Sequence, residues 1–167
     1  MKVIIFILIL LTSCSYKQEI EIKEAETSIY WKYYKVLKQE EGLSLKAYKC
    51  TANRWTIGYG HRTFKKVKEI SLLKAELLLI LDYNRAILDT KQLFPSVDYE
   101  TACKLSLLCF QVGRKGLSEF KELAKIINHN SQDADAGFYI YEALKNSKLN
   151  KQAPARTERL IEILTRG

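Results

Sequence analysis

Residues 41–61 read EGLSLKAYKCTANRWTIGYGH, and this stretch decides the expected fold. Apolar residues at helical spacing precede it, and Gly42 is a typical residue just beyond a helix end, so we expect that helix to end at about Glu41. Strand-forming residues follow on both sides of a turn at 52–54. The pattern predicts a helix from Ile29, then a small β-hairpin or three-stranded sheet.

The rest of the chain reads as helical. The leucine-rich segment 71–92 predicts a long helix, and 98–112 is apolar nearly all round, as in a central buried helix. A turn is expected at 113–116. Further helices are expected at 118–128, at 133–144 and from Pro154 to about Thr165, where proline suits the first turn. The predicted fold class is α+β, with a small sheet beside a mainly helical lobe.

Composition sets broad bounds. The chain has 167 residues, 47% of them hydrophobic, which suits one domain with a sizeable core. The net charge of +8 favours polyanionic partners. The basic residues are scattered without a recognised motif, which argues against nucleic acid. His61 and His129 lie far apart in sequence, so we expect neither a metal ion nor a cofactor.

The first fourteen residues are expected to be a lipoprotein-type signal peptide. Lys2 precedes an apolar run at 3–11, which is too short to span a bilayer. The ending Leu11-Thr12-Ser13-Cys14 resembles a bacterial lipobox, in which the chain is cut before the cysteine and the cysteine is lipidated. An ordinary signal peptide and a signal-arrest anchor are the alternatives.

This reading gives three segments and a location. Residues 1–14 are expected to be the signal, the charged segment 15–27 a tether, and 28–167 the main folded domain. A lipidated Cys14 would anchor the protein to the membrane, facing the periplasm or the cell exterior. Of the three remaining cysteines, Cys103 and Cys109 fall in an apolar helix and suit the core, whereas Cys50 falls in a polar strand-turn segment.

The order of Glu41 and the hairpin suits the cleavage of a glycosidic bond. A carboxylic acid at a cleft mouth becomes a general acid when burial raises its pKa. The reaction also needs a group opposite the acid to supply or orient a nucleophile. Gly58 and Gly60 would let a sugar or a backbone approach closely. Glu40 is a rival acid, but it faces about 100° away on the helix.

The residues at these positions resemble a known family. Glu41-Gly42, Ala47-Tyr48, Cys50 and the run 56–61 fit Glu-x8-Asp/Cys-x5-Thr, the signature of phage-type lysozymes, glycoside hydrolase family 24, which includes lysozymes of T-even phages. The segment 110–113, Phe-Gln-Val-Gly, and the segment 152–159 around Pro154 and Arg156 resemble later segments of that family.

The resemblance implies hydrolysis of the β-1,4 bond between N-acetylmuramic acid and N-acetylglucosamine in peptidoglycan by a monomer. Glu41 is similar to the general acid, Cys50 takes the place of the second catalytic group, and Thr56 matches the residue that helps to hold water or the intermediate. Supporting positions follow from the same comparison: Arg156 would pair with Glu41, His61 with Asp82, and Gly60, Phe110 and Gln111 would lie at the cleft.

Three questions stay open at this stage. An ordinary thiol has a pKa of about 8.5, so Cys50 could be an activated nucleophile or only position water, and the stereochemical outcome is undecided. A non-catalytic peptidoglycan-binding module and a lytic transglycosylase are the alternative functions. The aromatic residues Tyr30, Trp31, Tyr33 and Tyr34 could form a sugar platform, although packing is the simpler interpretation.

Overall fold

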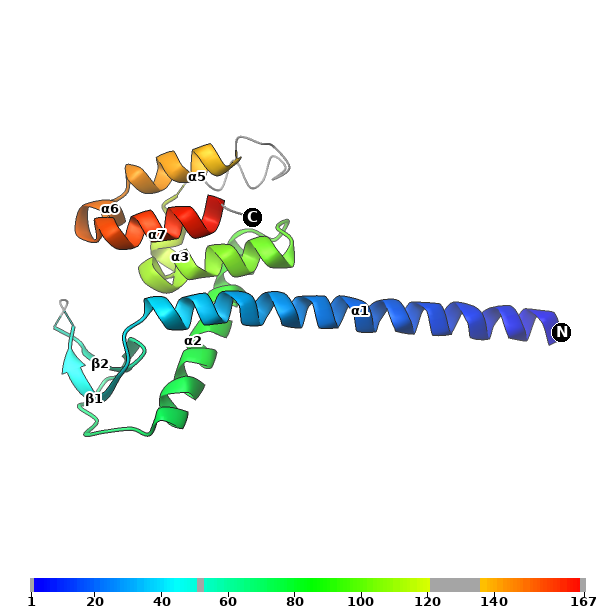
Figure 1. The fold of residues 1–167 in the computed structure, drawn as a ribbon, viewed down its shortest axis with the longest axis horizontal. Helices are drawn as coiled ribbons and strands as arrows, with labels where there is room; N and C mark the ends of the chain where they lie inside the picture. Colours follow the sequence, from blue (N-terminus) through cyan, green and yellow to red (C-terminus); the bar gives the residue numbers. More distant parts are fainter. Residues whose placement is uncertain (1, 51–52, 121–135, 166–167) are drawn as a thin grey trace.

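The protein is described by a computed structural model that covers residues 2–50, 53–120 and 136–165. Its fold is α+β, as predicted: one small antiparallel sheet lies at one end of the molecule, beside the helices (Figure 1). In chain order the elements are α1 (Lys2–Glu40), β1 (Ser44–Lys49), β2 (Trp55–Gly58), β3 (His61–Arg62), α2 (Leu72–Leu93), α3 (Tyr99–Ser118), α5 (Ala136–Lys145), α6 (Lys148–Gln152) and α7 (Pro154–Thr165).

Helix α1 is one continuous helix, and its N-terminal part extends away from the rest of the molecule (Figure 1). The expected start at Ile29 was therefore wrong. The segment 2–40 contains neither proline nor glycine, and extending a helix that is already anchored by packing costs little. The C-terminal part of α1 packs against the domain through the buried side chains of Tyr33, Tyr34 and Leu37. Over the described residues, no helix has a stretch long and apolar enough to cross a bilayer.

The sheet has the order β1-β2-β3, with both pairs antiparallel. At the turn before β2, the Cys50 amide donates to the Arg54 carbonyl at 3.0 Å, and Asn53 has a left-handed φ of 56°. Asparagine tolerates this conformation better than most residues, which fits the predicted turn. Ile57 of β2 is almost fully buried and attaches the sheet to the domain.

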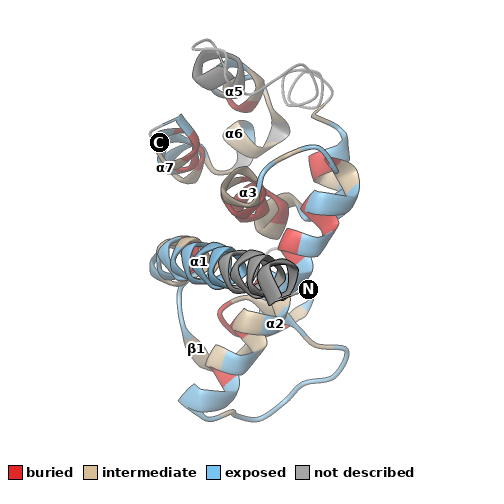
Figure 2. Cartoon of the chain, turned by 90° about the vertical axis from the view of Figure 1, so that its right-hand side faces the viewer, coloured by how far each residue is buried: buried red, intermediate tan, exposed pale blue. Residues whose placement is uncertain are grey.

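Helices α2 and α3 form the centre of the domain. Ser71 caps α2 and Asp98 caps α3, each by accepting a hydrogen bond from a backbone amide three residues on. Helix α3 lies between α1 and α7 (Figures 1 and 2) and carries more buried residues than any other described element, Cys103 and Cys109 among them. Both cysteines are thus core residues, as expected.

The end of α3 differs from the prediction. Instead of a turn over 113–116, a single residue, Gly113, leaves helical geometry with φ 73° and ψ 168°, and the helix resumes as far as Ser118. Glycine adopts this conformation at little cost, so it kinks the helix without ending it. Ser118 is therefore the end of α3 and not the start of the helix expected at 118–128, and 121–135 lie outside the described residues.

The last helices agree with the prediction. Helix α7 has the expected bounds and begins with Pro154. Helix α5 covers the described part of the helix expected at 133–144. One face of α7 is buried, and it is formed by Thr157, Leu160, Ile161 and Leu164. This packing places the N-terminal part of α7 beside the C-terminal end of α1.

Candidate active site

Glu41 lies where the long helix gives way to the sheet. Its amide donates to the Leu37 carbonyl at 3.0 Å, one residue after α1 ends. The helix ends within one residue of the predicted position and Gly42 follows its end, although the φ of Gly42 is not positive. The chain turns directly toward β1, which starts at Ser44. Glu41 is thereby fixed at the junction of the two parts of the fold.

Three helices converge on the Glu41 carboxylate. The side-chain amide of Gln111, from α3, donates to Oε1 of Glu41. Nη2 of Arg156, from α7, lies 3.5 Å from Oε2. Arg156 also donates from Nη1 to the Gln111 carbonyl oxygen at 2.6 Å, which closes a triangle of polar contacts. The Glu41 side chain is only 10% exposed, so its orientation is set by these partners.

The environment of Glu41 favours a protonated acid. Burial raises the pKa of the Glu41 carboxyl, because desolvation disfavours the charged form. The Arg156 guanidinium and the hydrogen bond from Gln111 pull the pKa down, while the charge of Glu40 pushes it up. The net shift is upward. An upward shift is the direction that a general acid requires, because such a group must hold a proton when substrate arrives.

The neighbouring Glu40 has a different environment. Its Oε2 lies 2.5 Å from Nε of Arg159, and its carbonyl accepts from Arg156 at 3.4 Å. The Glu40 carboxylate thus contacts Arg159, whereas the Glu41 carboxylate contacts Gln111 and lies beside Gly60 of the sheet. The geometry therefore favours Glu41 over Glu40. The ion pair between Glu40 and Arg159 was not predicted, although the sequence held a signal for it. Arg159 lies about one helical turn after Arg156, so it falls on the same side of the last helix, and Glu40 directly precedes Glu41.

The hairpin holds the other two candidate residues. Thr56 is buried in β2, opposite Tyr48, and its hydroxyl donates to the Arg54 carbonyl at 3.2 Å. Cys50 follows β1 directly and is half-buried. The two thus lie at the same end of the β1–β2 pair. A nucleophile-positioning role for them is a matter for the proposed function.

Gly60 brings the second turn of the sheet against Glu41. Its φ is +91°, and a Cβ built on this residue would lie 3.7 Å from Oε2 of Glu41. Glycine therefore keeps the backbone in a conformation that side chains rarely adopt and leaves space beside the carboxylate. This contact shows that the sheet and the triangle of Glu41, Gln111 and Arg156 are neighbours.

The remaining predicted residues have structural contacts. Nδ1 of His61 lies 2.8 Å from Oδ2 of Asp82, so the predicted pair between sheet and α2 forms. Phe110 is half-buried and packs against the core. The expected lipidation residue Cys14 falls in α1, where the side chains of residues 2–16 lie outside the described part. Among the described residues, no group of three or more potential ligands could hold a metal ion.

The aromatic residues of α1 pack together, as the simpler interpretation predicted. Tyr33 and Tyr34 are buried, and Tyr30 packs against Tyr83 with ring centroids 5.2 Å apart. Trp31 contacts Tyr30 and Tyr34 edge-on, also at 5.2 Å. These contacts dock α1 against α2 and leave no continuous aromatic platform.

A buried acid at the end of a helix, held by two further helices beside a small sheet, is the arrangement of a lysozyme-like hydrolase, and the sequence comparisons agree. Residues 38–159 match the phage lysozyme family. The chain belongs to this family and is a lysozyme-type glycan hydrolase, and so a glycoside hydrolase.

Two relatives illustrate the match. The chain is 28% identical over 162 residues to "Probable T4-type lysozyme 2" of Dictyostelium discoideum, covering 79% of this chain and 92% of the relative. It is 32% identical over 115 residues to "Endolysin" of Acyrthosiphon pisum secondary endosymbiont phage 1, covering 66% of this chain and 77% of the relative.

Proposed function

We propose that the protein is a muramidase that hydrolyses the β-1,4 bond between N-acetylmuramic acid and N-acetylglucosamine in bacterial peptidoglycan. The observation that carries the proposal is the Glu41 carboxyl, which is largely buried, has a raised pKa and lies beside Gly60, where no side chain crowds its Oε2. Family membership supports the class of reaction, and the endolysin relative supports the cell wall as substrate.

In the proposed reaction Glu41 donates its proton to the glycosidic oxygen while the bond from that oxygen to the anomeric carbon breaks. A water oxygen bonds to the anomeric carbon, and the water proton that is lost restores the acid or leaves to solvent. Gln111 and Arg156 hold the carboxyl in place and stabilise the carboxylate once the proton has gone. The transition state has positive, oxocarbenium-like charge, and a nearby carboxylate stabilises this charge.

Cys50 and Thr56 are proposed to act from the hairpin. Thr56 is fixed by strand pairing and by its bond to the Arg54 carbonyl, so its oxygen can accept a hydrogen bond from water at a defined position. Cys50 either positions that water or attacks the anomeric carbon as a thiolate. Water positioning leads to inversion, whereas attack by the thiolate leads to retention.

We further propose that residues 1–14 are a lipoprotein signal and that a lipidated Cys14 tethers the enzyme to the membrane outside the cytoplasm, through 15–27. The lipobox-like ending supports lipidation. In the structure 15–27 belongs to α1, where the described side chains are mostly exposed, as suits a segment between membrane and domain. A monomer is sufficient for the proposed chemistry, because Glu41 and its partners come from one chain.

Product analysis on purified peptidoglycan tests the catalytic proposal. Wild type should release new reducing ends, and Glu41→Gln should lower the rate by roughly 10²–10⁴-fold, the usual contribution of a general acid. Glu40→Gln is the matched control and should retain most activity, because its partner is Arg159. Equal rates for wild type and Glu41→Gln would overturn the proposal. Anhydromuramic ends would show a transglycosylase, and binding without cleavage would show a non-catalytic module.

The role of Cys50 can be separated by two substitutions. Full activity in Cys50→Ser would exclude attack by sulfur, because a hydroxyl is far less ionised than a thiol near neutral pH. Wild-type activity in Cys50→Asp with inverted product would support water positioning. A retained anomeric configuration that is lost in Cys50→Ser would support a thiolate nucleophile.

A further inference from the structure

The outward face of α2 carries a stripe of leucines. Leu73, Leu77, Leu81 and Leu88 are 48–68% exposed. Their spacing places them within about 80° of one another around the helix axis, and at about 1.5 Å per residue the stripe is roughly 22 Å long. Single exposed leucines are ordinary on protein surfaces, but four on one helix face, interrupted only by the exposed Asn84 between Leu81 and Leu88, form an apolar patch of the kind that marks a place of interaction.

The basic and acidic residues of α2 differ in their exposure and in their partners. Along 72–93, all of which the structure describes, the exposed positions include Lys74, Arg85 and Lys91 and no acidic residue. The three acids of α2 are engaged elsewhere: Glu76 pairs with Lys38, Asp82 with His61, and Asp89 with Arg85 and Arg114. The outward face of α2 is thus apolar and basic.

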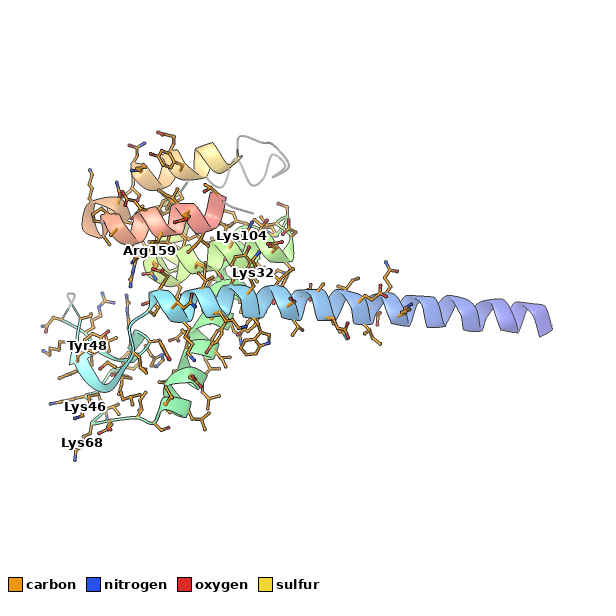
Figure 3. All side chains as sticks on the ribbon, viewed as in Figure 1. Lys32, Lys46, Tyr48, Lys68, Lys104 and Arg159 are labelled. Carbon is orange, nitrogen blue, oxygen red and sulfur yellow. The ribbon has the colours of Figure 1, made fainter. Side chains whose placement is uncertain are left out.

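The loop that leads into α2 has the same character. Phe64 is completely exposed, and Val67 is exposed beside Lys65 and Lys68. Figure 3 shows Lys46 and Lys68 projecting from the same end of the molecule, where the backbone of Lys46 in β1 forms an isolated antiparallel β-bridge with Glu69 of the loop. The loop therefore adds an aromatic side chain and further positive charge at the N-terminal end of the leucine stripe.

We propose that this surface, formed by the outward face of α2 and the loop 63–70, docks the domain on an anionic lipid bilayer. Leucine and phenylalanine side chains gain free energy by entering the boundary between headgroups and acyl chains. Lysine and arginine beside them attract anionic headgroups. The excess of basic residues selects this occupant, because a second copy would bring its own lysines and arginines against the same face.

Docking would complement the proposed tether but does not depend on it or on the catalytic mechanism. A lipid at Cys14 restricts the protein to the membrane, whereas α2 and its loop would set how the domain lies on it. A contact of this kind would add its own free energy to the attachment that a lipid at Cys14 supplies. Glu41 lies on other elements, α1 and its junction with β1, so the docking face is separate from the candidate active site.

Quenching by brominated lipids in vesicles with and without phosphatidylglycerol tests the docking. In the full chain, Leu81→Trp places a probe in the stripe, and Glu158→Trp on the exposed surface of α7 is the matched control. Both variants keep the N-terminal apolar run and both native tryptophans, so insertion of that run contributes equally. We expect strong quenching of Trp introduced at 81, little at 158, and a marked loss when phosphatidylglycerol is omitted.

Substitutions on the face sharpen the test. In the Leu81→Trp protein, Leu73→Gln with Leu77→Gln should weaken the partitioning measured by quenching at least about tenfold, since burial of even one leucine is worth about that factor. Lys68→Glu with Lys74→Glu should abolish the preference for phosphatidylglycerol. Hydrolysis of solubilised wall fragments should be unchanged in all these variants, which separates failure of docking from failure of catalysis.

Three results would overturn the proposal. Equal quenching at 81 and 158 would show that the stripe makes no specific contact with lipid. Absence of quenching at 81 while the protein sediments with vesicles would show attachment through another segment. Concentration-dependent dimerisation that shields the tryptophan at 81 without vesicles would assign the face to a second copy of the chain.

Discussion

Nη2 of Arg156 lies 3.5 Å from Oε2 of Glu41, although the two residues come from the last helix and from the end of the first. Gln111 of α3 contacts both side chains. The orientation of the candidate acid therefore depends on the docking of α3 and α7 against α1. Four predictions follow from this geometry and from the contacts around the sheet.

Replacing Arg156 by glutamine should shift the pH dependence of activity. The guanidinium lowers the pKa of Glu41, so its loss should raise that pKa further. A general acid is active when protonated, and its pKa sets the alkaline limb of the profile. That limb should move to higher pH in Arg156→Gln, measured as kcat/KM on peptidoglycan. Arg159→Gln is the control, since its partner is Glu40, and an equal shift in both would contradict the assignment.

Replacing Glu41 by glutamine should preserve or increase stability at neutral pH. The folded state raises the pKa of Glu41, so it binds the proton more tightly than the unfolded chain does. Ionisation of Glu41 therefore costs stability as pH rises above its unfolded pKa, which is about 4.3. Glutamine removes that cost, and thermal unfolding at pH 7 should show a Tm equal to or a few degrees above wild type, with the gain vanishing in acid.

The matched control is Glu40→Gln, which breaks the ion pair with Arg159 and should not raise the Tm. A lower Tm for Glu41→Gln than for wild type at pH 7, with the two converging in acid, would contradict the direction of the pKa shift.

Two glycine substitutions should separate stability from activity. Gly60→Ala forces a side chain into a φ of +91° and brings Cβ within 3.7 Å of Oε2 of Glu41, so both stability and kcat should fall. Gly58→Ala, at φ +66°, brings Cβ to 3.4 Å from Cβ of Ala75 on α2, away from the acid. Each should cost about 1–2 kcal/mol in unfolding free energy. Urea unfolding and wall hydrolysis on the same samples check the difference.

The pair of His61 and Asp82 should couple the sheet to α2. Their atoms lie 2.8 Å apart and both side chains are about one-third exposed. A double-mutant cycle with His61→Ala and Asp82→Ala should give a coupling energy of about 0.5–1 kcal/mol. The exposed pair Lys32–Glu100, at 3.4 Å, is the comparison and should give less. Equal coupling in the two cycles would contradict the prediction, because the contact between the sheet and α2 would then be worth no more than an exposed surface pair.

Local signals in the sequence placed the helices well. Helix α7 has its expected bounds because Pro154 fixes the start through its own backbone restriction. Helix α2 has nearly its expected bounds because the Ser71 side chain caps it locally. The predicted start of α1 and the predicted turn after α3 were wrong because the periodicity of apolar residues marks only helix faces that pack. The part of α1 before Ile29 extends away from the domain without a helix-breaking residue, and Gly113 kinks α3 without ending it.

The sequence by itself determined which local element carries each candidate residue: Glu41 lies at a helix end, Cys50 and Thr56 lie at fixed spacing in a hairpin, and an arginine lies in the last helix. Each of these follows from interactions within a few residues of chain. Only the tertiary structure decided that Gln111 joins Arg156 to Glu41, that Arg159 engages Glu40, and that the leucines of α2 face outward. Distances between helices and the burial that shifts a pKa arise from packing of segments distant in sequence, so only the folded chain sets them.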